Sequence, residues 1–584
     1  MRLGGSTINP RMDQSIRKNV ALTEFALLAS VIICLVLRFR LIFLLNIDVD
    51  EFSFLSQVYK YGKGTLGNPY FTFHVHLFSW LPYLPGDEVF QIIAGRAVMV
   101  FLGIGSCGLL YLITRLFISR IGALFSVLCY LSVSNVIVHG TSFRFDPICV
   151  FLFLMAVYLI LRKHRSRLPA VAAGLCMAIS LLVTLKSIFH LVTIAGIVFC
   201  LVIFSEKRKD TVLDSVWFLV SFAIGFLVLF LLHSYSLTGA SVSAHEEYLI
   251  RLSRSGILFV SFMPERIYMF LAVTENLAPL AFGIAGISVL LLDIGFRRNI
   301  PGNVLLLFLL APVFSLLFYQ FNFPYFYVFC LSSGMAVSGV LPDRIAKKYN
   351  RNGSRFLLTC LVASYVLLLI CFLGHYKKHS VDRTVTQREI LHGVHEMFPE
   401  PVPYIDRCHM VSSFPMVGIQ MTTWDMERYT KANLPIMHDL LVRRRPVFIL
   451  ANIAHLNLSQ PWGTGREIFQ VDPLLKEDFM VLRDNFIHHW GIVYVAGKRF
   501  VFGREDGPRI FENLIPGIYT IESVGNVWID RVLYRPGSKI RLENKRYTVL
   551  PQSTPTEVVL RWGEDLYRPP DSLPHQPVFY GYYY

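Results

Sequence analysis

The feature that most constrains this chain is a series of apolar stretches, each close to the length that crosses a bilayer. A helix of about 20 apolar residues spans the hydrocarbon core. Eleven such stretches cover residues 20–45, 91–114, 121–139, 146–161, 169–185, 187–204, 214–234, 275–293, 302–319, 325–341 and 356–374. With 54% hydrophobic residues, the chain is predicted to be a polytopic α-helical membrane protein.

The loops between these stretches predict how the chain is oriented. Cytoplasmic loops carry an excess of Lys and Arg. If the N-terminus is cytoplasmic, the inner loops hold twenty such residues and the outer loops up to residue 324 hold seven. This bias largely explains the net charge of +15, so the basic composition gives no case for nucleic acid. An odd number of spans then places the chain after about residue 375 outside the cytoplasm.

The composition changes after residue 375 to that of a water-exposed region. Residues 385–398 are predicted to be helical, and short β-rich runs follow at 446–450, 491–496 and 499–502. After Pro516 the pattern becomes all β, with runs at 517–521, 527–534, 539–542, 546–550 and 557–562. We therefore predict three domains. They are a transmembrane domain (1–375), an extracytoplasmic α/β domain (376–515) and a β-rich, sandwich-like domain (516–584).

Three carboxylates follow the first predicted span directly. Asp48, Asp50 and Glu51 stand where the chain leaves the outer membrane surface. Ionisable groups beside lipid are costly unless solvated or paired, so they are candidates for a functional site. The alternative is a solvated loop that only ends the helix.

Other ionisable groups lie at the outer ends of the predicted helices. Arg144 and Asp146 stand between the third and fourth spans, Lys186 follows the fifth, and Arg38 lies near the outer end of the first. Arg144 and Asp146 could instead form an ion pair that orders a turn. Lys186 could instead extend its amine to the membrane surface.

Two long outer loops contain aromatic residues and histidines. The first, 46–90, includes Tyr70, His74 and His76 and suits amphipathic helices at the membrane surface. The second, about 235–274, is predicted to form another surface helix. An aromatic belt that merely anchors the protein is the alternative for both.

The order of these motifs resembles the GT-C membrane glycosyltransferases, most closely the protein O-mannosyltransferase and lipid A aminoarabinose transferase group. The resemblance rests on an Asp-Glu pair after the first span, an aromatic loop with histidines, an Arg-x-Asp, a Thr-x-Lys and an aromatic-proline turn at residues 322–326 that includes Tyr325. It covers about residues 20–340. One departure is that the family usually has His-Pro-Pro in the first loop, where this chain has His74, Val75 and His76.

The resemblance implies transfer of a sugar from a polyprenyl-phosphate donor to a hydroxyl acceptor at the outer membrane face, with inversion at the anomeric carbon. The acceptor would be a protein, lipid A or a glycan. A phosphate leaves without help from a general acid, so one carboxylate base and cations for the phosphate would be enough.

The resemblance also assigns roles to the residues. Asp50 would be the base, Glu51 its neighbour or substitute, and repulsion between these carboxylates would favour a base. Asp146 would orient the acceptor or pair with a cation. The remaining candidates are Arg144, Lys186 and Arg38 for the donor phosphate, and Tyr70, His74, His76 and Tyr325 for substrate binding.

No cofactor is expected. Asp50, Glu51, Asp146 and a histidine could hold a divalent metal, but the resemblance argues against a required one. The expected location is a bacterial inner membrane, with the endoplasmic reticulum membrane as the alternative.

Two other functions are weighed against this one. A transporter or flippase of a lipid-linked glycan would place charges near the bilayer midplane and show repeat symmetry, whereas the charges here cluster at one face. A membrane-anchored binding or sensing module would not need eleven spans. The tryptophans of the C-terminal region, including Trp462 and Trp528, could stack on sugars, but are predicted to be core residues.

Overall fold

The structure is a computed structural model that describes residues 14–162, 166–205, 207–237, 266–319, 322–463, 472–553, 556–570 and 578–579. The chain forms two compact units. The first contains Met1–Leu45, Lys60–Leu81 and Ile93–Asp382, and the second contains Asn46–Tyr59, Pro82–Ile92 and Arg383–Tyr584. Each unit is described by itself below.

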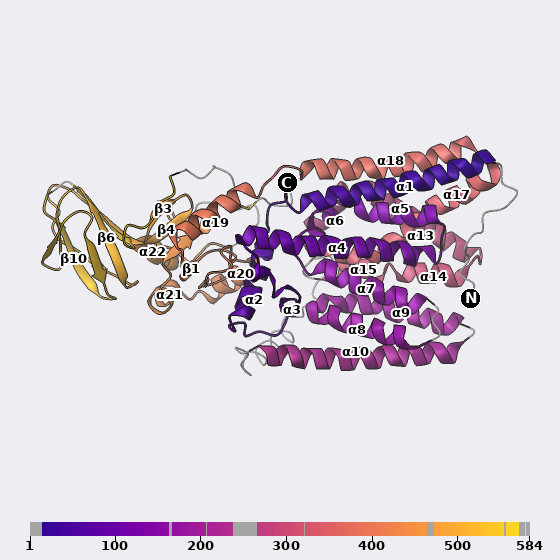
Figure 1. Cartoon of the computed structure of the whole chain (residues 1–584), viewed down its shortest axis with the longest axis horizontal. Helices are drawn as coiled ribbons and strands as arrows, with labels where there is room; N and C mark the ends of the chain where they lie inside the picture. Colours follow the sequence, from indigo (N-terminus) through magenta and orange to yellow (C-terminus); the bar gives the residue numbers. More distant parts are fainter. Residues whose placement is uncertain are drawn as a thin grey trace. The chain divides into compact units, whose positions relative to one another are not determined.

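The first unit is a bundle of apolar helices, whose long members lie side by side in Figure 1. Among the described residues, seven helices are long and apolar enough to cross a membrane. They are α1 (Gln14–Leu41), α4 (Glu88–Arg115), α9 with a preceding 3-10 turn (Leu185–Phe204), α10 (Arg208–Ser236), α13 (Leu277–Gly295), α16 continued by α17 (Phe326–Asn352) and α18 (Arg355–Lys378). The chain is thus a multi-pass membrane protein.

Further apolar helices complete the bundle. A bent pair, Ile300–Phe308 (α14) and Ala311–Leu317 (α15 with a 3-10 turn), forms another candidate span with a 41° bend. Three shorter apolar helices are α5 (Arg120–Leu131), α7 (Asp146–Leu161) and α8 (Leu168–Val183). Each of the eleven predicted stretches overlaps one of these helices, so the prediction of a polytopic helical fold is confirmed.

Short helices lie between these spans in the sequence. They are α2 (Val49–Gly62), α3 (Val75–Phe78), the 3-10 turn η1 (Leu81–Tyr83), α6 (Ser134–His139) and α12 (Arg266–Glu275). Within the bundle, α7 packs against α8 and α16, and α10 lies along α8 at its side (Figure 1). Leu227, Leu231 and Tyr235 of α10 remain exposed, as expected for a helix that faces lipid.

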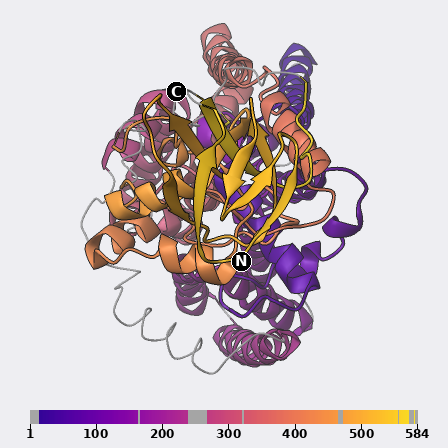
Figure 2. The same ribbon diagram turned by 90° about the vertical axis from the view of Figure 1, so that its left-hand side faces the viewer.

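The second unit combines helices with two β-sheets, and Figure 2 looks onto its strands. Its helices are α19 (Val385–Met397), α20 (Thr423–Ala432), α21 (Met437–Arg444) and α22 (Lys476–Asn485). Its strands are β1 (Tyr404–Ile405), β2 (Phe448–Leu450), β3 (Phe486–Trp490), β4 (Val493–Phe502), β5 (Arg509–Glu512), β6 (Gly517–Ser523), β7 (Val527–Ile529), β8 (Val532–Tyr534), β9 (Lys539–Leu542), β10 (Arg546–Pro551) and β11 (Thr556–Trp562).

The larger sheet has seven strands in the order β1-β2-β4-β11-β6-β9, with β3 paired to β4. The smaller sheet has the order β5-β10-β7-β8. Alternate residues of both sheets meet in one apolar core that includes Phe502, Ile521, Val527, Val549 and Leu560. This arrangement is a β-sandwich.

Two features of the second unit concern the predicted domains. The larger sheet contains strands from both sides of the predicted boundary at 515/516. The short segments 46–59 and 82–92 also belong to this unit. The predicted surface helix within 235–274 lies mostly outside the described residues.

Candidate functional site

The first part of the candidate site forms at the start of α7, where three predicted residues come together. Asp146 is the first residue of α7 and Pro147 follows it, so the carboxylate stands at the positive end of the helix dipole. Lys186 lies on the 3-10 turn between α8 and α9, and its amine binds the Asp146 carboxylate. Arg144 Nε lies 3.6 Å from the other Asp146 oxygen. All three side chains are buried.

Tyr325 covers this ionic cluster. Its ring centre lies 3.7 Å from the Arg144 guanidinium carbon and 5.1 Å from Lys186 Nζ. Phe326 and Phe329 also lie within 5.8 Å of Lys186 Nζ. Aromatic faces attract cations, most strongly when water is excluded. The predicted set of Arg144, Asp146, Lys186 and Tyr325 is therefore one connected cluster.

Two cations and one carboxylate meet in this cluster, because Arg144 and Lys186 both lie against Asp146. In a buried environment with low dielectric, cations attract an anion more strongly than they would in water. The two cations are therefore suited to contact a phosphate.

Arg38 lies in a different setting from the other cations. Its buried guanidinium donates from Nε to Thr141 Oγ1 at 3.2 Å and from Nη2 to the Gly140 carbonyl. The side chain also packs against Gly103 of α4, where a Cβ atom would lie 3.0 Å from Nη2. Arg38 thus holds the turn that leads from α6 to Arg144.

The predicted substrate-binding residues of the first loop separate into two places. The His74 ring is buried and lies 4.4 Å from the ring of Phe145, beside Asp146. Tyr70 instead contacts Phe230 of α10 at 5.5 Å. His76 Nε2 shares a hydrogen bond of 2.8 Å with Nδ1 of His233, also on α10.

Sequence reasoning missed three histidines of this unit. His233 also bonds Thr72 Oγ1 at 3.0 Å and ties the first loop to α10. His190 is stacked between Phe153 and Phe329, at 3.8 and 3.7 Å. The His139 ring meets the edge of Tyr325 at 6.2 Å. Their only signal in the sequence was a lone histidine within an apolar run.

The predicted base, Asp50, and its neighbour Glu51 lie in the second unit on α2, and Asp48 precedes that helix. Glu51 Oε1 accepts a hydrogen bond of 3.1 Å from the backbone N–H of Asp48, as in a capping box at the start of a helix. Glu51 is fully buried, whereas Asp50 is partly exposed. Glu51 therefore stabilises the helix end, and Asp50 is the more accessible carboxylate.

The C-terminal region holds α2 through several hydrogen bonds. Ile47 exchanges two with the side chain of Gln387, and the Phe52 carbonyl accepts one from Ser412. The apolar side chains of Phe52 and Leu55 are buried within the protein. The prediction that 46–90 forms helices with apolar faces in the membrane surface is thus wrong for this part of α2, because protein contacts cover that face.

A buried carboxylate, Asp406, lies in the same unit. It accepts hydrogen bonds from the backbone N–H groups of Cys408, His409 and Met410 at 2.7–3.0 Å, and from Asn452 Nδ2 at 3.3 Å. Burial raises its pKa to about 6, although these hydrogen bonds oppose the rise.

Among the described residues, no three His, Cys, Asp or Glu side chains gather as a metal-binding group. Asp146 already binds the Lys186 amine, and Glu51 caps a helix. The expectation that no divalent metal is required stays a prediction.

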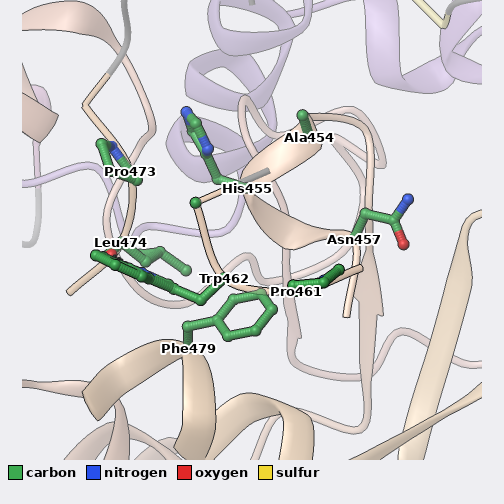
Figure 3. Close-up of a pocket in the computed structure, with 9 residues that line it drawn as sticks. Ala454, His455, Asn457, Pro461, Trp462, Pro473, Leu474 and Phe479 are labelled. Carbon is green, nitrogen blue, oxygen red and sulfur yellow. Dashed lines mark hydrogen bonds between the residues drawn. The ribbon is translucent and has the colours of Figure 1, made fainter. Parts of the chain in front are cut away.

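A small hollow in the second unit contains Trp462, as Figure 3 shows. Pro461, Leu474 and Phe479 surround the indole, whose N–H donates to the Leu474 carbonyl at 2.8 Å. The cavity has a volume of about 10 Å³, which holds about one water molecule. A sugar ring does not fit there.

Comparison with known families points to membrane glycosyltransferases. Residues 74–235 match the family model of the dolichyl-phosphate-mannose-protein mannosyltransferases. The matched region contains His74, Arg144, Asp146 and Lys186, but neither Asp50 nor Tyr325. No curated protein matches the sequence.

The solved structures that are similar to this chain include an oligosaccharyltransferase and ArnT. The apo oligosaccharyltransferase of Archaeoglobus fulgidus is 11% identical, with a TM-score of 0.55 over 94% of this chain and 98% of that chain. ArnT from Cupriavidus metallidurans, bound to undecaprenyl phosphate, is 14% identical, with a TM-score of 0.51 over 72% of this chain and 92% of that chain. Both are GT-C glycosyltransferases. This chain therefore has the GT-C fold, and the resemblance read from its motifs is confirmed.

Proposed function

We propose that this protein transfers a sugar from a polyprenyl-phosphate donor to a hydroxyl acceptor at a membrane surface. The observation that carries the proposal is the buried cluster of Arg144, Asp146 and Lys186, in which two cations meet one carboxylate. The match to the mannosyltransferase model over residues 74–235 and the GT-C fold support it. ArnT, whose fold is similar, binds undecaprenyl phosphate.

The cluster would bind the donor phosphate. Arg144 and Lys186 can each donate hydrogen bonds to a phosphate oxygen, and such charge-assisted bonds are stronger than neutral ones. The Asp146 carboxylate keeps the two cations in place. As the bond from the anomeric carbon to the phosphate oxygen breaks, the cations stabilise the charge that develops on the leaving phosphate.

The acceptor hydroxyl attacks the anomeric carbon and loses its proton to a carboxylate. The bonding electrons of the donor leave with the phosphate, so no acid is required, and a direct displacement inverts the anomeric carbon. We assign the base to Asp50 on its position in the sequence and on its accessibility, since Glu51 is buried in a helix cap. A positioned base contributes about 10²–10⁴ in rate.

The remaining predicted residues take indirect roles in this proposal. Arg38 is a positioning residue, because it holds the Gly140–Thr141 turn that precedes Arg144. His74 supports the same segment through Phe145. Tyr70 and His76 belong to the contact between the first loop and α10.

The test measures donor consumption in native membranes that contain the candidate acceptors. Polyprenyl phosphates carrying radiolabelled mannose or aminoarabinose are added, and loss of label from the donor lipid is followed. We expect the wild type to consume one of them and Asp50→Asn to be at least about 100-fold slower.

Asp48→Asn is the matched control. Asn caps a helix as well as Asp does, so we expect a rate within about twofold of the wild type. Equal rates for Asp50→Asn and the wild type would show that another residue is the base. If the wild type consumes neither donor, the proposed function is wrong.

A further inference from the structure

The smaller sheet of the second unit has an apolar row on its outer face. Trp528 of β7 stands opposite Leu550 of β10 on one side and Leu533 of β8 on the other. The neighbours of Trp528 and Leu550 along their strands, Val527, Ile529 and Val549, point into the sandwich core. Because side chains alternate along a strand, the row faces away from that core.

Trp528 differs from a core tryptophan. Its side chain is 39% exposed, which contradicts the prediction that it is a core residue. It lines an open cleft of about 660 Å³ together with Pro508, Asp530, Arg531, Thr548 and Leu550.

The rim of the cleft carries polar groups of both charge signs. Asp530 and Arg531 form the two-residue turn between β7 and β8, and both have positive φ, 48° and 70°. The Asp530 carboxylate accepts a hydrogen bond of 2.8 Å from the Thr548 N–H, which fixes the turn over β10, and its other oxygen lies 3.8 Å from Lys545 Nζ. A carboxylate, a guanidinium and a hydroxyl thus border one exposed indole.

We propose that this cleft binds a saccharide. A sugar ring has an apolar C–H face that packs on an indole and hydroxyl groups that both donate and accept hydrogen bonds. Asp530 can accept from them, Arg531 can donate, and Thr548 can do both. The cleft lies over the face of the sheet, whereas a peptide strand would pair with a sheet edge. A membrane surface would favour a uniformly basic rim.

The site is distinct from the proposed reaction centre, and its residues take no part in bond breaking. Binding in the cleft therefore requires neither donor lipid nor turnover. It can be measured even if the proposed transfer reaction is wrong.

The test is saturation-transfer NMR on the full chain in detergent micelles, with α-linked mannotriose as the neutral probe and trigalacturonate as the acidic probe. We expect transfer from the protein to the ring protons of at least one probe. Trp528→Ala should reduce this transfer at least tenfold, and Arg531→Gln should reduce it by a smaller factor.

Trp462→Ala is the matched control, because Trp462 is also exposed but borders a cavity too small for a sugar. Its transfer should equal that of the wild type. Thermal unfolding midpoints check that each variant is folded. Absence of transfer to both probes, or equal transfer in folded Trp528→Ala and the wild type, would overturn the proposal. So would a change in association state on Trp528→Ala without loss of probe binding, since the face would then join copies of the chain.

Discussion

Asp146 in the helical bundle and Asp406 in the second unit are both buried carboxylates, but they are stabilised by different means. Asp146 lies against two cations, Arg144 and Lys186. Asp406 accepts three backbone N–H groups and the amide of Asn452. Both arrangements give the buried carboxylate at least one hydrogen-bond donor, as a buried polar group requires.

The two arrangements differ in the charge of the groups that surround the carboxylate. Backbone donors are neutral dipoles, so the Asp406 loop gains order but no excess charge. Asp146 is instead held by two cations, which can also attract a phosphate. A buried carboxylate therefore suggests an anion site where cationic side chains, and not backbone N–H groups, surround it.

Lys186→Met has the largest expected effect, because it removes one of the two cations that hold Asp146. Asp146 would then keep only Arg144, whose Nε lies at 3.6 Å. Removing one partner of a buried ion pair costs about 3–5 kcal/mol. We expect donor consumption to fall by at least about 100-fold, as measured in membranes with the labelled donors described above.

Lys347→Met is the control for this variant. Lys347 Nζ bonds Asp343 Oδ2 at 2.6 Å in the same unit, but its side chain is 42% exposed. Exposed ion pairs contribute about 0–1 kcal/mol, so activity should stay within about twofold. Equal losses in Lys186→Met and Lys347→Met would show that the cluster has no special role.

Asp406 should make the stability of the second unit depend on pH. Its pKa is about 6 in the folded protein against an ordinary value of 3.8. The protonated form therefore contributes stability that is fully present below about pH 3.8 and is lost as the pH rises through about 6. Each pKa unit corresponds to about 1.4 kcal/mol, so the loss is about 3 kcal/mol. Thermal unfolding of the wild type and Asp406→Asn, followed by intrinsic fluorescence from pH 4 to 7.5, measures it.

Because asparagine does not titrate, the Asp406→Asn midpoint should vary less across this window. His395 is a second group that titrates in a similar pH range. Burial lowers the pKa of His395, but its hydrogen bond to Glu88 and the charge of Glu88 raise it further, so the net shift is upward. Its contribution is likewise lost as the pH rises, through the raised pKa. The comparison is therefore made in a His395→Gln background. Parallel pH profiles for the two proteins would contradict the role of Asp406.

The sequence predicted well the features that short segments of the chain determine. The apolar stretches match the helices, and the β-rich runs after residue 516 match β6 to β11. The grouping of Arg144, Asp146 and Lys186 was also predictable, because each stands at the same end of neighbouring helices. Hydropathy and helix ends are properties of short segments, so they can be read without the tertiary structure.

What the sequence did not predict depends on contacts between distant segments. Nothing near Gln387 indicates that its side chain pairs with Ile47, 340 residues away. The His76–His233 bond joins segments 157 residues apart. Trp528 was predicted to be a core residue, as large aromatic residues commonly are, but the sequence does not say which face of its strand is covered. The exposed face of β7 became evident only from the pairing of four strands.

Arg38 gives the smallest expected effect. It is a buried charge whose hydrogen bonds go to neutral acceptors, a backbone carbonyl and a hydroxyl, just as Asp406 accepts from neutral backbone donors. If Arg38 is a positioning residue, Thr141→Val should lower donor consumption about fivefold, since it removes one hydrogen bond worth about 1 kcal/mol. Gly140→Ala should act in the same direction, because its Cβ would lie 2.4 Å from Arg38 Nη2.

The decisive measurement combines Gly140→Ala with Arg38→Met in a double-mutant cycle of donor KM and kcat. If Arg38 is a positioning residue, Gly140→Ala should reduce donor consumption less in the Arg38→Met background, because the clash with Nη2 is absent there. The contact of 2.4 Å with the Val136 carbonyl remains in both backgrounds. A direct phosphate ligand would behave differently. Arg38→Met would then raise the donor KM alone, and Thr141→Val, which leaves the positive charge in place, would change neither constant.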